Sequence, residues 1–545
     1  MSDAAFDYVV VGGGSAGSMA GAELARDPAV RVLVLEAGDA AERNPETLRA
    51  DGYQQAFLNE RLMWDRFTPP QPGLGGHRVF VGTGRGMGGS GSINAMVYTR
   101  GAAHDYDSWG VPGWAWRDVA PVFEEIERTL TPSRREPTQF TEACIAAAEA
   151  QGFRRKEDLN DGALAGCLGY EWMNYRGNER RSSYVAFLKP RLEQPNLRVE
   201  TGAVVNRIVF DGARRAIAVE AEVAGAPRRF ALTVGAGEVI VAAGALETPR
   251  IVERSGVGRG HELRAHGIAE VASAPGVGEN LHDHPNVPLF VWGRRPTDCK
   301  YVQLYGFHRA NPEAALPAGE ADSCFVFYTA RSSIREAAVK LGPTKVLPPA
   351  LFAKRWARGA LRGVIGVAMA SPPARYVLER MYGIIVILGK PESRGSVRLS
   401  SADPRAPGIV DPAYLSAPRD LDTLVRGVEW ARRIVATEPL AQWGSRPLSG
   451  AARSSERARL EAFVRANLIT TYHFAGSCRM GADAASVADE RLRLRGVTGV
   501  RVADASVMPS TPVSALNAPS MLIGFRAARM ALEERVTNHA RAANA

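Results

Sequence analysis

Three glycines and one acid near the amino terminus have the spacing of a nucleotide-binding site. Gly12, Gly14 and Gly17 form G-x-G-x-x-G, and Glu36 follows further along the chain. In this pattern the first glycine permits a tight turn, the second lets the backbone approach a pyrophosphate, and the third allows a helix to pack closely on a strand. An acid after the next strand can accept hydrogen bonds from ribose hydroxyls. The four residues therefore predict that the chain binds an adenosine-containing dinucleotide.

The elements that must position these residues can be recognised around them. Tyr8 to Val11 is a short apolar, β-branched run, which is typical of a strand buried on both faces in a parallel sheet. Ser18 to Arg26 is expected to be a helix whose N-terminal amides and dipole face the pyrophosphate. Val32 to Leu35 is a second buried strand, and it ends at Glu36. Strand, glycine turn, helix, strand and acid in this order are far more specific than the glycines alone.

The chain is too long for one hydrophobic core. It has 545 residues, whereas single cores stop growing at roughly 250–300 residues, so we expect two domains. The hydrophobic share of 46% and the charged share of 23% are ordinary for a globular protein in water. The net charge is +9, but no run of Lys and Arg and no nucleic-acid motif accompanies it, so no nucleic-acid partner is expected.

Cysteine usage and the chain start indicate a compartment. The five cysteines are odd in number and show no C-x-x-C spacing, which favours reduced thiols without a zinc site or disulfide framework. No basic region precedes the strand at Tyr8, and no apolar run is long enough to span a bilayer. We therefore expect a cytoplasmic location. Nothing in the sequence predicts the oligomeric state.

A second glycine-rich stretch, GTGRGMGGSGSINAMVYTRG, runs from Gly82 to Gly101. So many glycines in its first half cannot form a regular element, but they suit a backbone pressed against a flat, phosphate-bearing ligand. Asn94 to Val97 then begins a packed segment that carries the loop. This apolar continuation argues against a flexible linker.

Several stretches in one order resemble the glucose–methanol–choline (GMC) oxidoreductases, which bind FAD. The glycine-rich stretch is followed by DYDSWGVPGWAW, GALETPRIVERSGVG, APGVGENLHDH and PESRGSVRLSSADP. HFAGSCRMG, GVRVADASVMP and LNAPSM complete the series. The resemblance spans nearly the whole chain, and several independent motifs in one order are more specific than any single pattern. It implies an FAD-dependent oxidoreductase.

The resemblance implies an α/β fold: a Rossmann-like FAD-binding domain of GMC type with a discontinuous α+β substrate domain built on an antiparallel sheet. The FAD-binding domain would comprise residues 1–150, 195–290 and 456–545, and the substrate domain residues 151–194 and 291–455. The sequence itself indicates strands at Asn196 to Val199, Ala203 to Phe210 and Ala216 to Val223, with a hairpin turn at Asp211-Gly212. Glu238 to Ala242 is another buried strand.

A flavin site that oxidises an alcohol needs a base, and histidine suits this role because its pKa lies near neutrality. His473 lies in the stretch that resembles the family's catalytic histidine segment, and Asn517 matches the position of the second catalytic residue. His473 would accept the hydroxyl proton while hydride moves to flavin N5, and the Asn517 amide would hold the developing alkoxide. The alternative is a core histidine between Tyr472 and Phe474.

The sequence HDH at residues 282–284 invites a metal interpretation. Two neighbouring ring donors without a signal for a third ligand do not make a metal site, and the matching family segment is a loop on the cofactor side. We therefore expect no metal.

The resemblance also implies which residues hold FAD. FAD would be non-covalent, because Ile93 stands where some relatives carry the histidine that attaches it. Electrons would pass to oxygen or to a quinone-type acceptor. The predicted cofactor-binding residues are Gly12, Gly14, Ser15, Ala16, Gly17, Glu36, Ala37, Trp64, Gly86, Gly88, Ser92, Asn94, Ala95, Met96, Val97, Val204, Asp504, Ala505, Asn517 and Pro519.

The main functional hypothesis is oxidation of a primary or secondary alcohol to a carbonyl. Aromatic residues beside the base, Tyr472 and Phe474, favour an apolar or aromatic small-molecule alcohol. Two alternatives use the same fold: hydroxynitrile lyases, which keep the flavin but cleave a C–C bond, and a light-driven fatty-acid decarboxylase. Fold alone cannot choose among them, because function depends on the site.

The segment from Arg331 to Arg380 carries almost all of the net charge. Its ten Lys and Arg against two Glu make a local net charge of +8, compared with +9 for the whole chain. Apolar residues such as Phe352, Trp356 and Leu361 alternate with these charges. A basic amphipathic segment can contact an anionic membrane surface peripherally, or it can be a helical cap with a solvated charged face. The sequence leaves both interpretations open.

Overall fold

A parallel sheet forms around the first strand of the chain, as predicted. The computed structural model describes residues 5–352, 354–444 and 446–543. Strand β1 (Tyr8–Val11) is buried throughout and pairs in parallel with β2 (Val32–Glu36) on one side and β13 (Glu238–Val241) on the other. β9 (Leu197–Thr201) and β24 (Val500–Val502) extend the sheet to the order β24-β13-β1-β2-β9. Its apolar, β-branched strands are buried because helices and a second sheet cover it.

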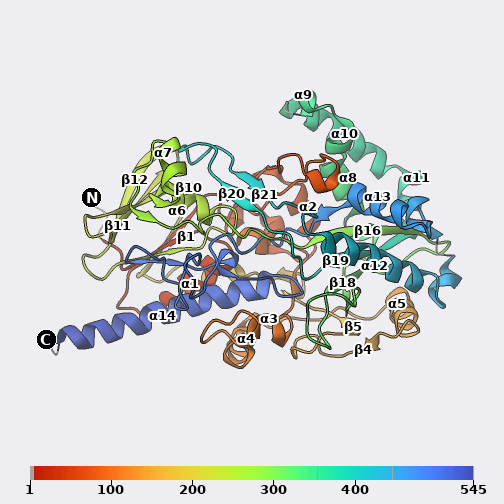
Figure 1. Cartoon of the computed structure of the whole chain (residues 1–545), viewed down its shortest axis with the longest axis horizontal. Coiled ribbons are helices and arrows are strands. Elements are labelled where there is room, and N and C mark those ends of the chain that lie inside the picture. Colours follow the sequence, from red (N-terminus) through yellow and green to blue (C-terminus); the bar gives the residue numbers. More distant parts are fainter. Residues whose placement is uncertain (1–4, 353, 445, 544–545) are drawn as a thin grey trace.

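Two helices far apart in the sequence pack together beside this sheet. Helix α1 (Ser15–Leu24) follows the glycine turn, and α14 (Asn517–Ala543) lies along it (Figure 1). The predicted helix start at Ser18 was wrong, because α1 begins at Ser15. Gly17 therefore lies within the first helical turn, where the absence of a side chain lets the helix approach the strand.

A smaller antiparallel sheet follows the predicted hairpin. β10 (Ala203–Phe210) pairs with β11 (Ala216–Val223), and β11 pairs with β12 (Ala226–Ala231). The predicted strands from Ala203 to Phe210 and from Ala216 to Val223 are thus confirmed. This sheet is tied to the first by contacts between β10 and β2.

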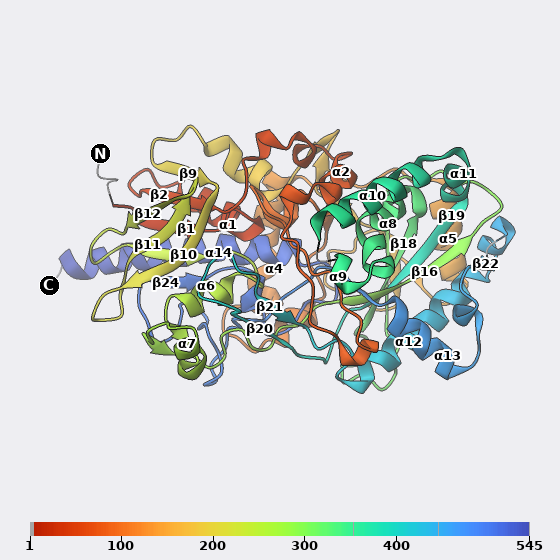
Figure 2. The same ribbon diagram turned by 90° about the horizontal axis from the view of Figure 1, so that it is seen from above.

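The other half of the molecule is built on a second large sheet, which is almost wholly antiparallel (Figure 2). Its main path is β22-β16-β19-β18-β17-β5-β4. Helices α12 (Pro418–Val435), α13 (Arg457–Asn467) and α5 (Gln139–Glu149) pack with this sheet around a core of their own. The strands are β22 (Arg446–Pro447), β16 (Pro285–Trp292), β19 (Met381–Leu388), β18 (Ser323–Thr329), β17 (Leu304–His308), β5 (Cys167–Tyr170) and β4 (Arg154–Arg155).

The α/β fold, with one parallel and one mainly antiparallel sheet, agrees with the predicted fold class. The predicted domain boundaries stay a prediction, and α5, at the end of the first predicted segment, contributes Phe140 and Ile145 to the core of the second sheet.

The basic segment forms four consecutive helices, which we call the helical cap (residues 330–380). They are α8 (Ala330–Val346), α9 (Pro349–Phe352), α10 (Arg355–Ala370) and α11 (Pro372–Arg380). Figure 1 shows α9 and α10 projecting above the rest of the molecule. Helix α8 contacts β18, β19 and the short helix α2 (Tyr53–Leu58), whereas α10 lies on α8. No helix in the described ranges is long and apolar enough to cross a membrane.

Candidate active site

The glycine turn after β1 has the shape that its sequence predicts. Gly12 has a φ of +106°, a left-handed conformation that strongly favours glycine. A Cβ on Gly17 would lie 1.8 Å from the carbonyl oxygen of Gly12, so only glycine lets α1 pack this closely. A Cβ on Gly14, in contrast, would find its nearest neighbour 3.9 Å away. Gly14 therefore borders open space, which is where a ligand's pyrophosphate can approach the backbone.

Glu36 joins three loops through its carboxylate. One oxygen accepts the N–H of Gly13 at 2.8 Å, and the other accepts those of Gly38 at 2.8 Å and Gly86 at 2.9 Å. Burial raises the pKa of this carboxyl, and the three amide donors oppose that rise. A carboxylate can accept about four hydrogen bonds, so capacity remains for a ribose hydroxyl. Glu36 thus also holds the two glycine-rich turns together, a role that the motif did not predict.

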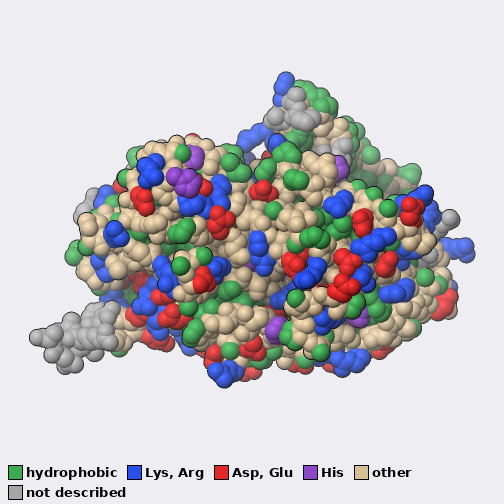
Figure 3. Space-filling view, in the orientation of Figure 1, with side chains coloured by type: hydrophobic (Ala, Val, Ile, Leu, Met, Phe, Trp, Pro, Cys, Tyr) green, Lys and Arg blue, Asp and Glu red, His purple; other side chains and the backbone are tan. Residues whose placement is uncertain are grey.

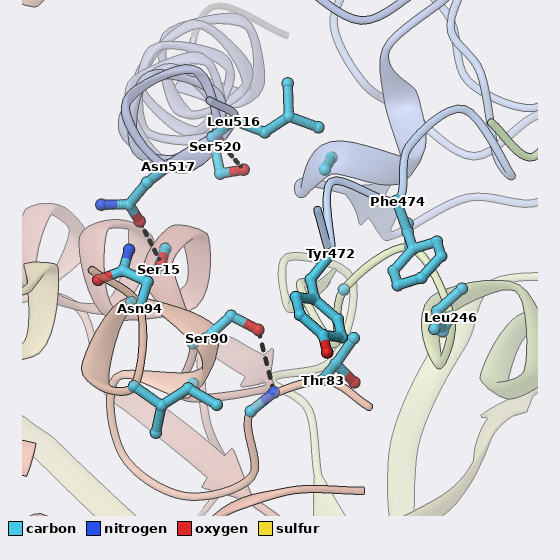
Figure 4. A pocket seen from close by; sticks show the side chains of 18 of the residues that line it. Ser15, Thr83, Ser90, Asn94, Leu246, Tyr472, Phe474, Leu516, Asn517 and Ser520 are labelled. Carbon is cyan, nitrogen blue, oxygen red and sulfur yellow. Dashed lines mark hydrogen bonds between the residues drawn. The ribbon is translucent and has the colours of Figure 1, made fainter. Parts of the chain in front are cut away.

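A long cavity of about 520 Å³ begins at the glycine turn and reaches the second sheet. It brings together residues predicted from segments hundreds of positions apart. Figure 4 shows one part of it, with Asn517, Ser15 and Asn94 on one side and Tyr472 and Phe474 on the other. The predicted residues that line it are Gly12, Gly14, Ser15, Ala16, Glu36, Ala37, Trp64, Asn94, Ala95, Val97, Val204, His473, Asp504, Ala505 and Asn517.

Six predicted cofactor residues lie behind the cavity wall instead of in it. Gly86 donates to Glu36, Gly88 donates to the Gly13 carbonyl at 2.8 Å, and Ser92 donates to the Met87 carbonyl at 3.0 Å. Such contacts shape the wall without reaching a ligand, and the binding role of this group stays a prediction. The full group is Gly17, Gly86, Gly88, Ser92, Met96 and Pro519.

Asn517 and Ser15 connect the amino termini of two helices. Asn517 is the first residue of α14, Ser15 is the first residue of α1, and the Ser15 hydroxyl donates to Oδ1 of Asn517 at 2.8 Å (Figure 4). Because Oδ1 is engaged, the Nδ2 group of Asn517 is the part that can donate to a ligand. Two helix amino termini also bring positive dipole ends to this part of the cavity, where they favour negative charge.

His473 is held from its backbone and from its ring. Its N–H donates to Oδ1 of Asp283 at 2.7 Å, and its Nδ1 lies 3.0 Å from Nδ1 of His284. The rings meet edge to face, with centroids 5.2 Å apart. One Nδ1 must therefore carry the shared proton while the other accepts it. Nε2 of His473 makes neither of these contacts, and the ring borders the cavity.

Asp283 is a buried anchor for this arrangement. Its Oδ2 accepts hydrogen bonds from the hydroxyls of Tyr414 and Thr470, both at 2.6 Å. Burial raises the pKa of Asp283, while the hydrogen bonds from Thr470, Tyr414 and the backbone of His473 counteract the rise. The acid thereby links β16, the loop at Tyr414 and the catalytic segment predicted around His473.

Burial keeps the histidines of the site neutral. It lowers the pKa of His473 to about 4 and that of His282 to about 3. Burial also lowers the pKa of His284 well below its usual value, and the neighbouring His473 adds to that effect. His473 is therefore in its basic, proton-accepting form at neutral pH.

The two histidines of the HDH sequence contact different partners and do not face a common metal position. Nδ1 of His282 contacts the carbonyl of Asn280 at 2.7 Å, whereas His284 faces His473. Within the described ranges, no group of three or more His, Cys, Asp or Glu side chains is arranged to hold a metal ion.

The residue before the base has an unusual backbone. Tyr472 has a φ of +62°, which is rare for a non-glycine residue, and such conformations concentrate at functional sites. Its ring meets Phe57 and Phe80 edge to face, at 6.5 Å and 6.2 Å between centroids. Phe474, on the other side of His473, packs in a small core with Leu246. The aromatic environment expected from Tyr472 and Phe474 thus extends to residues from distant segments of the chain, Phe57 of α2 and Phe80.

Three features escaped sequence reasoning. The sequence predicts no role for His284, although its Nδ1 contacts that of His473. Arg180 is fully buried and donates to the carbonyl and side-chain oxygens of Asn94 at 2.9 Å and 2.8 Å, which fixes the glycine-rich loop. Glu336 of α8 is buried in the cavity wall, and burial raises its pKa. No local sequence pattern predicts the roles of Arg180 and Glu336.

The parallel sheet, the glycine turn and the long cavity are typical of dinucleotide-binding α/β proteins, and His473 lines the same cavity. Residues 6–286 match the amino-terminal part of the GMC oxidoreductase family, and residues 391–524 match its carboxy-terminal part. The chain belongs to this family, which implies FAD as cofactor. The resemblance noted in the sequence is thereby confirmed.

Relatives cover nearly the whole chain. An uncharacterised GMC-type oxidoreductase of Mycobacterium tuberculosis is 34% identical over 96% of this chain and 99% of its own length. An alcohol dehydrogenase [acceptor] of Pseudomonas putida is 30% identical over 96% of this chain and 95% of its own. The crystal structure of pyridoxine 4-oxidase from Mesorbium loti has a TM-score of 0.80 at 27% identity and covers 96% of this chain and 98% of that one.

Proposed function

We propose that this protein oxidises a primary or secondary alcohol to a carbonyl, with FAD as cofactor and His473 as base. The observation that carries the proposal is the cavity itself: one end has the glycine cradle and Glu36, and His473 and Asn517 line another part. The relatives named as an alcohol dehydrogenase and a pyridoxine oxidase support the same class of reaction.

The residues present fit FAD. The space beside Gly14 suits a pyrophosphate, Glu36 suits a ribose, and Val204, to which the family resemblance assigns the adenine, also lines the cavity. Ile93, which also lines the cavity, cannot form a covalent link to the cofactor, so we propose non-covalent FAD. When bound, FAD supplies the acceptor for the two electrons and the hydrogen that leave the alcohol carbon.

The histidine pair decides which ring nitrogen of His473 acts. If Nδ1 of His473 donates to Nδ1 of His284, Nε2 of His473 is unprotonated and can take the hydroxyl proton of the alcohol. The opposite tautomer would leave His473 with a proton on Nε2 and no basic nitrogen for the substrate. We therefore propose that His284 acts as the acceptor and so holds His473 in its basic tautomer.

We propose that Asn517 assists at the oxygen of the substrate. Ser15 occupies its Oδ1, so its Nδ2 can donate a hydrogen bond to the substrate oxygen as negative charge develops there. The same contact keeps the amide from rotating to present its oxygen. His473 and Asn517 thus divide the work, since one removes the proton and the other stabilises the oxygen from which it leaves.

The cavity lining supports an apolar or aromatic substrate. Tyr53, Phe57, Met63 and Tyr472 line it near the helical cap. Glu336 is the acid in that wall, so an amino alcohol is a second group of compounds to test. Oxygen and a quinone are the two electron acceptors to compare afterwards.

An anaerobic screen tests the proposal. The purified flavoprotein is mixed without oxygen with aliphatic, aromatic and amino alcohols, and the oxidised flavin band is followed. Bleaching by an alcohol, with formation of the carbonyl product, supports oxidation. No bleaching with any alcohol, together with C–C cleavage or light-dependent loss of carbon dioxide, would instead assign a lyase or a decarboxylase. Admission of air, or addition of a quinone, then identifies the acceptor.

Two variants assign the residues. His473→Ala should keep FAD but slow flavin reduction by about 10²–10⁴-fold, the usual effect of removing a general base. Asn517→Ala should cost on the order of 10²–10³-fold, as loss of one oxyanion donor does. If His473→Ala reduces its flavin at the wild-type rate, the assigned chemistry is wrong.

A further inference from the structure

The helical cap has an inner layer and an outer layer. Its inner helix α8 contributes Glu336, Ala337 and Leu341 to the wall of the cavity. Its outer helices α9 and α10 project further from the body of the protein than α8, as Figure 1 shows. The outer layer therefore bears no part of the proposed site, and its surface needs a separate explanation.

Large apolar side chains are exposed along one face of α10. Trp356, Val364 and Val367 are 69%, 66% and 76% exposed. They are spaced by about two turns and then one turn, so they form one stripe along the helix. More than half of the large exposed apolar side chains in the described part of the chain belong to the cap. These are Val346, Leu351, Trp356, Val364, Val367, Tyr376 and Val377.

This stripe is not the face that packs on the protein. The opposite side of α10 carries Leu361 and Ile365, and Ile365 lies so close to Gly342 of α8 that a Cβ there would meet its Cδ1 at 2.7 Å. The side of α10 that carries Leu361 and Ile365 is thus already the apolar face that packs on the protein. A second apolar face on the same helix indicates an external partner, because monomeric proteins in water rarely expose contiguous apolar patches.

The charges around the stripe are of one sign. Lys354, Arg355 and Arg375 are exposed, and no described acid forms an ion pair with them. Of the two acids of the cap, Glu336 is buried and Glu379 is half-buried. Figure 3 shows hydrophobic side chains on the projecting cap, with Lys and Arg at its tip.

Other basic residues of the cap serve the fold instead. Arg358 pairs with Asp65 at 3.0 Å, and Arg362 pairs with Glu60. These two arginines fasten the cap to the body of the protein. The side chain of Lys345 lies outside the described part.

We propose that the outer layer of the helical cap docks on an anionic lipid bilayer, with the stripe of α10 in the interface and the exposed basic residues against lipid headgroups. Trp and aliphatic side chains on one face, with Lys and Arg beside them, are the composition of helices that lie in a membrane interface. The basic surface specifies the sign of the lipid charge, which a purely apolar contact with another protein would not require.

Vesicle co-sedimentation tests this docking without any assay of activity. The holoenzyme is mixed with vesicles of phosphatidylcholine alone or with phosphatidylglycerol added. We expect sedimentation with the anionic vesicles only, and a loss of binding of tenfold or more as ionic strength rises from about 0.05 M to about 0.5 M, because the Debye length shrinks. Failure of the wild-type protein to sediment at low salt would overturn the proposal.

Two triple variants and a matched control locate the surface. Lys354→Gln, Arg355→Gln and Arg375→Gln together should weaken binding on the order of 100-fold, since each basic residue near an anionic surface contributes about fivefold. Trp356→Gln, Val364→Gln and Val367→Gln should abolish it. The control, Arg117→Gln, Arg264→Gln and Arg459→Gln, removes the same charge from side chains that are 88%, 70% and 68% exposed elsewhere and should retain most binding.

Other outcomes are equally decisive. If the control weakens binding as much as the charge variant, attraction is due to net charge and the docking surface is refuted. If the wild type self-associates in light scattering, ignores vesicles and becomes monomeric in the apolar variant, the stripe binds a second copy of the chain. Flavin content and melting temperature, which should match the wild type in all three variants, verify that each is folded.

Discussion

Nδ1 of His284 lies 3.0 Å from Nδ1 of His473, so the residue proposed as base shares a proton with a second, fully buried histidine. Nε2 of His284 is buried, and burial lowers the pKa of the ring, while the nearby backbone carbonyl of Gly389 opposes that lowering. This surrounding suits a His284 that carries its proton on Nε2 and accepts at Nδ1. The pair therefore supports the tautomer in which Nε2 of His473 is free to act as base.

His284 is accordingly a positioning residue, and two substitutions separate this role from simple packing. His284→Leu removes the acceptor and should slow anaerobic flavin reduction by about 10²-fold, at the lower end of the effect of losing a base. His284→Asn places an amide oxygen near the former Nδ1 and should recover about tenfold of that loss. If both variants are equally slow while FAD content and melting temperature are unchanged, the acceptor role is refuted.

The buried His282 predicts a pH effect on stability. Burial lowers its pKa from 6.5 to about 3, so the unfolded chain binds its proton first as the pH falls. The contribution of neutral His282 to the free energy of unfolding is fully present above pH 6.5. Between pH 6.5 and about pH 3 it falls by about 1.4 kcal/mol for each pH unit of acidification.

Urea unfolding of wild type and His282→Asn isolates this contribution, because the many buried carboxyls are common to both proteins. The variant should have a lower free energy of unfolding than the wild type at pH 7.5. This difference between the two proteins should be smaller by about 2 kcal/mol at pH 5. A gap independent of pH would show that His282 titrates alike in both states.

The two glycines of the turn should respond differently to alanine. Gly17→Ala places a Cβ 1.8 Å from the Gly12 carbonyl oxygen, so it should lower the melting temperature or prevent folding. Gly14→Ala meets no atom closer than 3.9 Å and should fold normally. Its methyl group would occupy the space proposed for the pyrophosphate, so the flavin content of the purified protein should fall. A Gly14→Ala protein with a full complement of bound FAD would contradict the assigned pyrophosphate site.

FAD should leave the protein on denaturation. Acid precipitation of the yellow holoenzyme followed by centrifugation should leave the colour in the supernatant, because Ile93 has no nucleophilic atom with which to bond the flavin. Colour that remains in the pellet would refute non-covalent binding. Mass spectrometry of the intact chain provides an independent measurement, since covalent FAD would add its mass.

The sequence by itself determined the elements whose signals are local. Strand β1, the glycine turn, β2 and Glu36 follow each other within one short stretch. The hydrophobic pattern, the turn residues and the burial of this stretch all indicate the same structure. The strands β10 and β11 were equally predictable from alternation and an Asp-Gly turn. The family resemblance added His473 and Asn517, which no periodicity would have distinguished from core residues.

Only the tertiary structure decided how these pieces meet. The contact between Ser15 and Asn517 joins residues 502 positions apart, and His284 and His473 are 189 positions apart. Such pairings depend on how the two sheets pack, which no local pattern encodes. The same holds for the cap: its sequence showed charge and apolar residues, but only packing separated the arginines that pair with Asp65 and Glu60 from the exposed stripe on α10. A side chain's partners are set by the fold around it, because burial and charge pairing are properties of the assembled chain.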